Sequence, residues 1–303
     1  MTRRFCLVVN PAAGGGRSQR LLPEVTAALS AAGADHEVHA STSLEHAREL
    51  AIAAAGRGEV TVAFGGDGMV GALAGTVAGA GGAFGIIAAG RGNDFARTLG
   101  LPSEPAAAAR ALAGGAERGV DLIAVGQAGS AAEVLVAGSV YLGLPAIAAQ
   151  TATQSRFPPG ELAYPVAGLR AVAGWREARF RLEFDDGDSE EFSGGAVVAA
   201  NSRYFGAGMM VAPHADTGDG LLDVVLMRGG SKLAMLRGLA KIKTGEHLAM
   251  PQVSVRRARE LSITVDRDML GGADGETLGC SAPLPAGTPL LVRALPGALR
   301  LIG

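Results

Sequence analysis

The chain has 303 residues and a nearly balanced charge, with 27 lysines and arginines against 29 aspartates and glutamates. A chain of this length favours two domains over a single core, and the balanced charge argues against nucleic acid as a partner. Its two cysteines, Cys6 and Cys280, form neither a disulfide framework nor a metal-ligand pattern, which indicates a reducing, cytoplasmic compartment.

The first part of the chain, to about residue 125, is predicted to alternate strands and helices. The apolar run from Phe5 to Val9 is too short for a signal peptide and is predicted to be a buried strand. Further strands are expected from residue 38 and at 60–64, 84–88 and 120–125, with helices at 21–32, 47–54, 69–78, 93–98 and 105–113. This alternation is typical of a doubly wound α/β domain.

Beyond residue 125 the pattern changes to short β-type runs separated by turn residues, which predicts a mostly antiparallel second domain. Strands are expected at 133–141, 180–184, 197–200, 222–227, 253–255 and 261–265, and helices near 161–174 and 231–242. The final apolar runs, at 290–295 and 299–302, suit either domain. We therefore expect a first domain at 1–125, completed by about 293–303, and a second at 126–292.

Three glycine-rich turns follow predicted strands, at 10–16, 65–68 and 90–94. Ligands of doubly wound sheets bind beyond the carboxyl ends of the strands, so these turns are expected to form one pocket. The glycines at 65, 66 and 68 are expected to take positive φ angles and to bring N–H groups against an anion. Asp67 repels a phosphate unless a cation lies between them or the carboxylate orders neighbouring N–H groups, so the motif predicts a nucleotide with Mg²⁺. An ordinary strand-to-helix turn is the alternative.

The chain contains no P-loop and no G-x-G-x-x-G motif after the first strand. It does contain an ordered series of short motifs: Val9-Asn10-Pro11 with its glycines, Gly65-Gly66-Asp67-Gly68, Gly92-Asn93-Asp94-Phe95-Ala96-Arg97, Asn201 to Gly208, Ala212-Pro213, Asp219-Gly220-Leu221-Leu222-Asp223 and Asp274-Gly275-Glu276. In their order and spacing these motifs resemble the diacylglycerol kinase catalytic family, which includes bacterial lipid kinases and the sphingosine and ceramide kinases. The likeness runs almost end to end.

The resemblance implies an N-terminal α/β domain related to NAD kinase, a C-terminal β-sandwich, and ATP with Mg²⁺ as cofactors. It assigns nucleotide contacts to Asn10, Gly14, Gly15, Ser41, Gly65, Gly66, Asp67, Gly68, Asn93 and Glu276. For Ser41, a helix cap ahead of Glu45 is the alternative.

The resemblance also gives roles to carboxylates. Asp67, Asp94 and Asp121 match groups that the family places near the catalytic metal, with Asp94 and Asp121 also on the substrate side. A helix cap for Asp94 and a strand end for Asp121 are the alternatives. Asp274 matches the general base that takes the proton from a lipid hydroxyl, so Asp274, Asp67 and Asp94 form the expected catalytic set. A plain hairpin turn is the alternative at Asp274.

A second, structural Mg²⁺ is implied in the loop before the strand at 222. Similar bacterial enzymes hold it through an aspartate carboxylate, here Asp219, and through main-chain carbonyls that fall on Asp216 and Leu221. A tight Asp-Gly turn without metal is the alternative for this segment.

Three positions depart from the family pattern. Met69 replaces a common threonine, Gly71-Ala72 replaces Asn-Glu, and Arg91 stands where a threonine or serine is typical. A guanidinium can fork onto phosphate oxygens, so Arg91 is a candidate nucleotide contact, with solvent exposure as the other interpretation.

We therefore expect an ATP- and Mg²⁺-dependent lipid kinase that phosphorylates a lipid hydroxyl, with diacylglycerol as the leading substrate. An NAD kinase-like enzyme and a degraded regulatory protein that binds nucleotide or lipid are the alternatives. No run of about 18 residues is apolar without glycine or charge, so membrane contact is expected to be peripheral. The oligomeric state stays open, a homodimer included.

Overall fold

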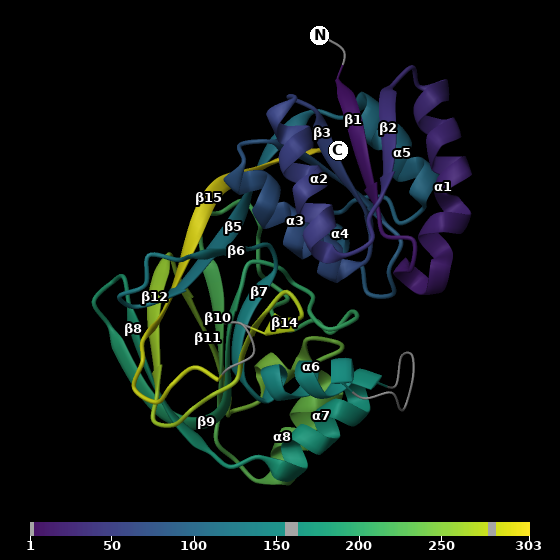
Figure 1. Cartoon of the computed structure of the whole chain (residues 1–303). Coiled ribbons are helices and arrows are strands. Elements are labelled where there is room, and N and C mark those ends of the chain that lie inside the picture. Colours follow the sequence, from purple (N-terminus) through teal and green to yellow (C-terminus); the bar gives the residue numbers. More distant parts are fainter. Residues whose placement is uncertain (1–2, 155–162, 278–282) are drawn as a thin grey trace. The chain divides into compact units, whose positions relative to one another are not determined.

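The computed structural model describes residues 3–154, 163–277 and 283–303, so Cys280 and the start of the helix expected at 161 lie outside the described residues. The chain divides into two compact units (Figure 1). Unit 1 comprises Met1–Leu122, Thr217–Asp219 and Leu295–Gly303, and unit 2 comprises Ile123–Asp216 and Gly220–Ala294. Two long strands, β5 (Glu117–Gln127) and β15 (Leu290–Ile302), contribute residues to both units.

Unit 1 contains a parallel sheet with strand order β2–β1–β3–β4–β15. Its further strands are β1 (Arg4–Val9), β2 (Asp35–Ala40), β3 (Val60–Gly65) and β4 (Ala83–Ala88), and its helices are α1 (Ala13–Ala31), α2 (Leu44–Gly56), α3 (Asp67–Gly79), α4 (Asp94–Thr98) and α5 (Pro105–Gly114). The predicted doubly wound α/β domain is thereby confirmed.

Helices cover both faces of this sheet, which explains why its strands are apolar throughout. Val60, Val62 and Phe64 of β3 pack in one cluster with residues of α1 and α5. The side chain of Thr61 points to the opposite face, where its hydroxyl donates to the carbonyl of Ala51 in α2. Because both faces are covered, the loops at the carboxyl ends of the strands are left to bind ligands.

Unit 2 is an antiparallel β-sandwich with added helices, as predicted in outline. Its main strand path is β14–β13–β7–β9–β8–β12–β15, and β9 also pairs with β10, which pairs with β11. The strands are β6 (Val134–Val136), β7 (Ser139–Gly143), β8 (Ala178–Phe184), β9 (Ser189–Ala200), β10 (Leu222–Arg228), β11 (Val253–Ala258), β12 (Glu260–Val265), β13 (Gly271–Ala273) and β14 (Glu276–Thr277). The helices are α6 (Leu144–Gln154), α7 (Ala163–Gly174), α8 (Lys232–Lys241) and the short 3₁₀ helix η2 (Glu246–Ala249).

Two features of unit 2 differ from the sequence expectation. The strand expected at 133–141 is interrupted at Ala137-Gly138, because the N–H groups there turn to a carboxylate described below. Helix α6 was not predicted, since its segment carries no charged residue that would mark a solvent face. In the part of the chain that the structure describes, no helix has the length and apolar character needed to cross a membrane.

Asp121 ties three separate segments of unit 1 together. It is the fifth residue of β5 and not a strand end, so that interpretation of the sequence was wrong. Its backbone N–H donates to the carbonyl of Thr217 at 2.7 Å, and its Oδ1 accepts the N–H of Gly297 at 2.7 Å. Only 2% of Asp121 is exposed, whereas Gly297 is at the surface, so the bond between them is partly shielded from water.

We expect Asp121→Ala to lower the free energy of unfolding by about 1–3 kcal/mol, because the N–H of Gly297 loses the carboxylate oxygen that accepts its hydrogen bond. Asp121→Asn retains a carbonyl oxygen at that position and serves as the matched control, with a smaller loss. Urea unfolding followed by circular dichroism measures both. Equal losses in the two variants would show that the hydrogen bond to Gly297 is not the stabilising feature.

Candidate active site

The carboxylate of Asp67 joins two loops of unit 1. Asp67 is the first residue of α3, and its Oδ2 accepts the N–H of Asn93 at 2.8 Å while its Oδ1 accepts the N–H of Asp94 at 2.6 Å. Asn93 has a left-handed φ of 53°, and α4 begins at the next residue. A carboxylate is favoured at such a helix N-terminus. Asp67 therefore orders neighbouring N–H groups, which is one of the two roles that the sequence allowed.

Glycines let the three loops of unit 1 approach one another closely. A Cβ added to Gly90 would lie 2.6 Å from the Cα of Gly66, and one added to Gly14 would lie 2.3 Å from the carbonyl oxygen of Ala89. The backbone N–H of Asn10 donates to the carbonyl of Phe64 at 3.1 Å, which links the first loop to β3. The glycine-rich loops after β1, β3 and β4 are thus in direct backbone contact.

The expectation that Gly65, Gly66 and Gly68 have positive φ angles was wrong. Gly66 precedes α3 with a φ of −99°, and Gly68 lies in the first turn of that helix. The helix begins at Asp67, two residues earlier than predicted, so these glycines need no left-handed backbone. The positive φ angles belong instead to Gly14, Gly15 and Gly16, at 58°, 68° and 84°. Regular helix in α1 therefore starts only after Gly16.

The other candidate nucleotide contacts occupy defined positions. The Oγ of Ser41 donates to the carbonyl of Val9 at 3.0 Å, at the end of β1. The cap of α2 is Ser43, whose hydroxyl accepts the N–H of His46, so the helix-cap interpretation of Ser41 was wrong. Arg91 is exposed, and it forms no ion pair with any described residue. Glu276 begins β14 in unit 2.

The carboxylates expected near metal do not gather into one cluster. Asp94 is buried at the start of α4, and Asp121 lies within β5. Over the described ranges, no three His, Cys, Asp or Glu side chains approach closely enough to hold a metal ion, and this includes the exposed Asp216 and Asp219 before β10. Leu221 follows Gly220, whose φ of 72° is typical of a tight turn.

Asp274 is held in a similar way in unit 2. It forms a two-residue hairpin turn with Gly275 between β13 and β14, and both residues have positive φ angles, at 47° and 89°. Its Oδ2 accepts the N–H of Ala137 at 2.7 Å, and its Oδ1 accepts those of Gly138 at 2.8 Å and Ser139 at 3.1 Å. Three N–H donors favour the ionised carboxylate and fix its orientation. Asp274 is therefore in a hairpin turn and is also a positioned anion.

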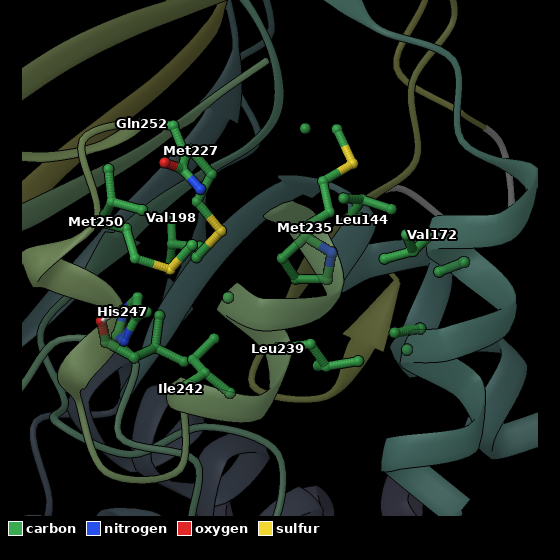
Figure 2. Close-up of a pocket in the computed structure, with 18 of the residues that line it drawn as sticks. Leu144, Val172, Val198, Met227, Met235, Leu239, Ile242, His247, Met250 and Gln252 are labelled. Atoms are coloured by element: carbon green, nitrogen blue, oxygen red, sulfur yellow. Dashed lines mark hydrogen bonds between the residues drawn. The ribbon is translucent and has the colours of Figure 1, made fainter. Parts of the chain in front are cut away.

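An apolar pocket lies within unit 2, and residues of α6, α7 and α8 form part of its lining (Figure 2). Its cavity volume is about 120 Å³, and part of the pocket is open to solvent. Four of the eight methionines of the chain line it, namely Met209, Met227, Met235 and Met250. Methionine is flexible and adapts to irregular apolar ligands. The concentration of methionines between residues 209 and 250 is a signal in the sequence from which this pocket could have been predicted.

His247 is a buried titratable residue in the pocket lining, and only 1% of it is exposed. Its Nε2 lies 3.0 Å from the carbonyl of Val211, whereas its Nδ1 has no hydrogen-bond partner in the described part of the chain. Burial lowers the pKa of His247, against a smaller opposing effect of the bond to Val211. The imidazole is therefore neutral in the folded protein, with Nε2 as the donor.

Comparison with known proteins supports this geometry. Residues 4–125 match the model of the diacylglycerol kinase catalytic domain, and residues 138–303 match that of the YegS C-terminal NAD kinase beta sandwich-like domain. A diacylglycerol kinase of Mycobacterium tuberculosis (strain ATCC 25618 / H37Rv) is 31% identical over 299 residues, covering 97% of this chain and 93% of that protein. The chain belongs to the diacylglycerol kinase family.

More distant members of the diacylglycerol kinase family agree with this assignment. A diacylglycerol kinase of Bacillus subtilis (strain 168) is 26% identical over 280 residues, which cover 90% of each chain. The crystal structure of a putative diacylglycerol kinase from Bacillus anthracis str. Sterne aligns with a TM-score of 0.79 at 22% identity, covering 99% of this chain and 95% of that one. That structure supports the fold of both units.

The loop contacts predict unequal effects of two neighbouring substitutions. Gly14 and Gly15 both have positive φ angles, so alanine at either position adds about 1–2 kcal/mol of backbone strain. Only at Gly14 does the new Cβ also collide with a carbonyl oxygen, because nothing lies within 4 Å of a Cβ at Gly15. We expect Gly14→Ala to lower the melting temperature clearly more than Gly15→Ala. Equal melting temperatures would contradict the close approach of the loop to Ala89.

His247 predicts a loss of stability in mild acid. The unfolded chain takes up a proton near the ordinary histidine pKa of about 6.5, whereas the folded protein does so only at lower pH. Between these two values the unfolded state binds more protons, so stability falls as the pH falls below about 6.5. His247→Gln removes this proton uptake and should flatten the dependence of the unfolding free energy on pH between about 7 and 5. Parallel profiles for the two proteins would contradict a lowered pKa.

Proposed function

We propose that this chain is an ATP- and Mg²⁺-dependent lipid kinase that transfers the γ-phosphate of ATP to a lipid hydroxyl, with diacylglycerol as the leading substrate. The observation that carries the proposal is the set of glycine-rich loops held together by Asp67. Phosphoryl transfer depends mainly on positioning and charge stabilisation, and rigid loops at helix N-termini supply both. The names of the relatives and the family models support the same reaction class.

The residues of unit 1 fit a nucleotide. A Cβ at Gly15 or Gly68 would meet no atom within 4 Å, so the backbone of both loops faces open space. We assign the phosphates to these loops, with Asn10 and Ser41 at the end of β1 as further contacts. Mg²⁺ usually binds proteins through one or two carboxylates and substrate phosphates, so the lack of a three-carboxylate cluster is compatible with its use. Asp67 and Asp94 are the carboxylates that we assign to it, and the ion would neutralise charge on the phosphates.

The apolar pocket of unit 2 fits the acyl part of a lipid. Its walls are mainly aliphatic, aromatic and thioether side chains, with Arg228, Gln252 and His247 as the polar side chains of the described lining. The neutral Nδ1 of His247 is an acceptor that a hydroxyl or a water can satisfy. A sugar or a dinucleotide would leave its polar groups without partners in such a pocket.

In the proposed reaction, Asp274 positions the lipid hydroxyl and accepts its proton. The hydroxyl oxygen forms a bond to the γ-phosphorus, the bond from that phosphorus to the β–γ bridging oxygen breaks, and ADP leaves. The three N–H donors on Asp274 hold the carboxylate ionised, as a base requires before the step.

One observation favours a second candidate, a regulatory protein without turnover. The sulfur of Met69 lies 2.7 Å from the position of a Cβ on Gly65, so a thioether packs on the glycine-rich loop where the family commonly has a hydroxyl. An NAD kinase-like activity is the third candidate, because the fold is shared. The two candidates predict different results with γ-labelled ATP: a regulatory protein labels no acceptor, whereas an NAD kinase-like enzyme labels NAD.

The test is incubation of the full chain with γ-labelled ATP, Mg²⁺ and one acceptor at a time: diacylglycerol, a sphingoid base, ceramide or NAD. Label on diacylglycerol supports the proposal in full, and label on another lipid corrects the substrate. Label on NAD alone, or on none of the four at an enzyme concentration that binds ATP, would overturn it.

Asp274→Asn is expected to lower kcat by at least about 10²-fold, because it removes the proton acceptor. Its amide can replace only one of the two oxygens that accept N–H bonds, so a lower melting temperature is also expected. Asp268→Asn is the matched control, since the Oδ1 of Asp268 also accepts a backbone N–H in unit 2. ATP affinity from calorimetry should be unchanged in both variants. Near-parental turnover of Asp274→Asn would exclude this residue as the base.

A further inference from the structure

Helix α8 of unit 2 has one face that lines the apolar pocket. Ala234, Met235, Gly238 and Leu239, followed by Ile242, are among the lining residues. Their spacing places them on a single side of the helix. Figure 2 shows Met235, Leu239 and Ile242 among the side chains drawn around the pocket. This side of α8 is thereby assigned to the pocket.

The opposite side of α8 carries two leucines, of which Leu233 is exposed and Leu236 is half-buried. Leu233, Leu236, Arg237 and Ala240 recur at the spacing of one helical face, and none of them lines the pocket. Leu233 is 57% exposed, the largest value among the large apolar side chains of the described residues. No residue of the helix is buried. A helix of a globular protein usually presents polar residues on its solvent side. The exposed apolar residues of this outer face are instead typical of a surface that binds another molecule.

Positive charges surround this outer face without compensation. From Gly229 to Gly245 the sequence has Lys232, Arg237, Lys241 and Lys243 and no carboxylate, although the chain as a whole carries a formal charge of −2. Within the described ranges, Arg237, Lys241 and Lys243 take part in no ion pair. Lys232 donates to the carbonyl of Ala173 at the end of α7. Arg237, Lys241 and Lys243 are therefore a local concentration of cations without an ion-pair partner among the described residues.

We propose that the outer face of α8, defined by Leu233, Leu236, Arg237 and Ala240 with Lys241 and Lys243 beside it, docks on the surface of an anionic lipid bilayer. A basic helix with an apolar side lies in the interface of such a membrane, with the apolar residues among the headgroups and acyl chains. Leu169 of α7, a helix that packs against α8, is 51% exposed and adds apolar surface.

A second copy of the chain is a poorer occupant of this face. A twofold interface would bring the same patch of both copies together, and the cations of one patch would then face those of the other. An anionic bilayer instead places phosphates opposite the cations and strengthens binding by about fivefold for each lysine or arginine near the surface.

Docking by α8 has a direct consequence for substrate entry. The docked face and the pocket face are two sides of one helix, so a lipid leaving the bilayer has a short path to the pocket. Only this consequence rests on the proposed kinase function, because docking itself requires no turnover.

The experiment is flotation of the full chain with vesicles of phosphatidylcholine alone and of phosphatidylcholine mixed with phosphatidylglycerol. We expect binding to the mixed vesicles, little binding to phosphatidylcholine, and release by salt. Lys241→Gln/Lys243→Gln should weaken binding to mixed vesicles by about 10-fold or more. Leu233→Ser should weaken it as well. The matched control is Arg110→Gln/Arg181→Gln, which removes the same charge from exposed positions on α5 and β8 and should bind as the parent does.

Equal binding to both kinds of vesicle, or equal loss in the α8 variant and its control, would overturn the docking proposal. Transfer of label to a short-chain, water-soluble diacylglycerol separates this outcome from failure of the kinase proposal. We expect that transfer to be unchanged in Lys241→Gln/Lys243→Gln. A parent protein that floats with anionic vesicles but labels no acceptor would refute the kinase function and leave docking standing.

Discussion

The two hydrogen bonds from the backbone N–H groups of Asn93 and Asp94 to the carboxylate of Asp67 are the constraint on which the candidate site depends. They hold the N-terminus of α3 against that of α4. This arrangement requires the backbones to approach so closely that Gly66 and Gly90 tolerate no side chain between them. The two N–H donors also partly compensate the negative charge of the Asp67 carboxylate, so this carboxylate and a phosphate can be neighbours in one site. Loss of that pairing would separate the loops that we assign to the nucleotide.

Unit 2 uses the same device at a second carboxylate. Asp274 accepts three N–H bonds from residues 137–139, and its own backbone takes a left-handed conformation to reach them. A non-glycine residue at positive φ is strained by about 1–3 kcal/mol, and a hydrogen-bonded ion can offset that strain. In each unit, backbone N–H groups hold one candidate catalytic carboxylate, Asp67 in unit 1 and Asp274 in unit 2.

The helices of unit 2 serve a different purpose from those of unit 1. In unit 1 they cover a sheet and complete its core, whereas α8 has no buried residue and instead separates an apolar pocket from an apolar, basic outer face. A pocket of methionines and aliphatic side chains suits acyl chains that vary in shape. Under the proposed function, unit 2 would bind the lipid and the loops of unit 1 would bind the phosphates.

The sequence by itself determined the fold class, the order of the elements of unit 1 and the meeting of three glycine-rich loops, because local periodicity and the rule for parallel sheets carry that information. Its ordered short motifs indicated the family. It did not determine the backbone angles of Gly66 and Gly68, which follow from the start of α3 at Asp67. Nor did it identify the partners of Asp274, which lie more than 130 residues earlier in the chain. Tertiary structure likewise decided the role of Asp121 between Thr217 and Gly297, the formation of helix α6, and the pocket that α6 helps to line. These features depend on contacts between segments distant in sequence, and among them only the pocket left a local signal, the methionines between residues 209 and 250.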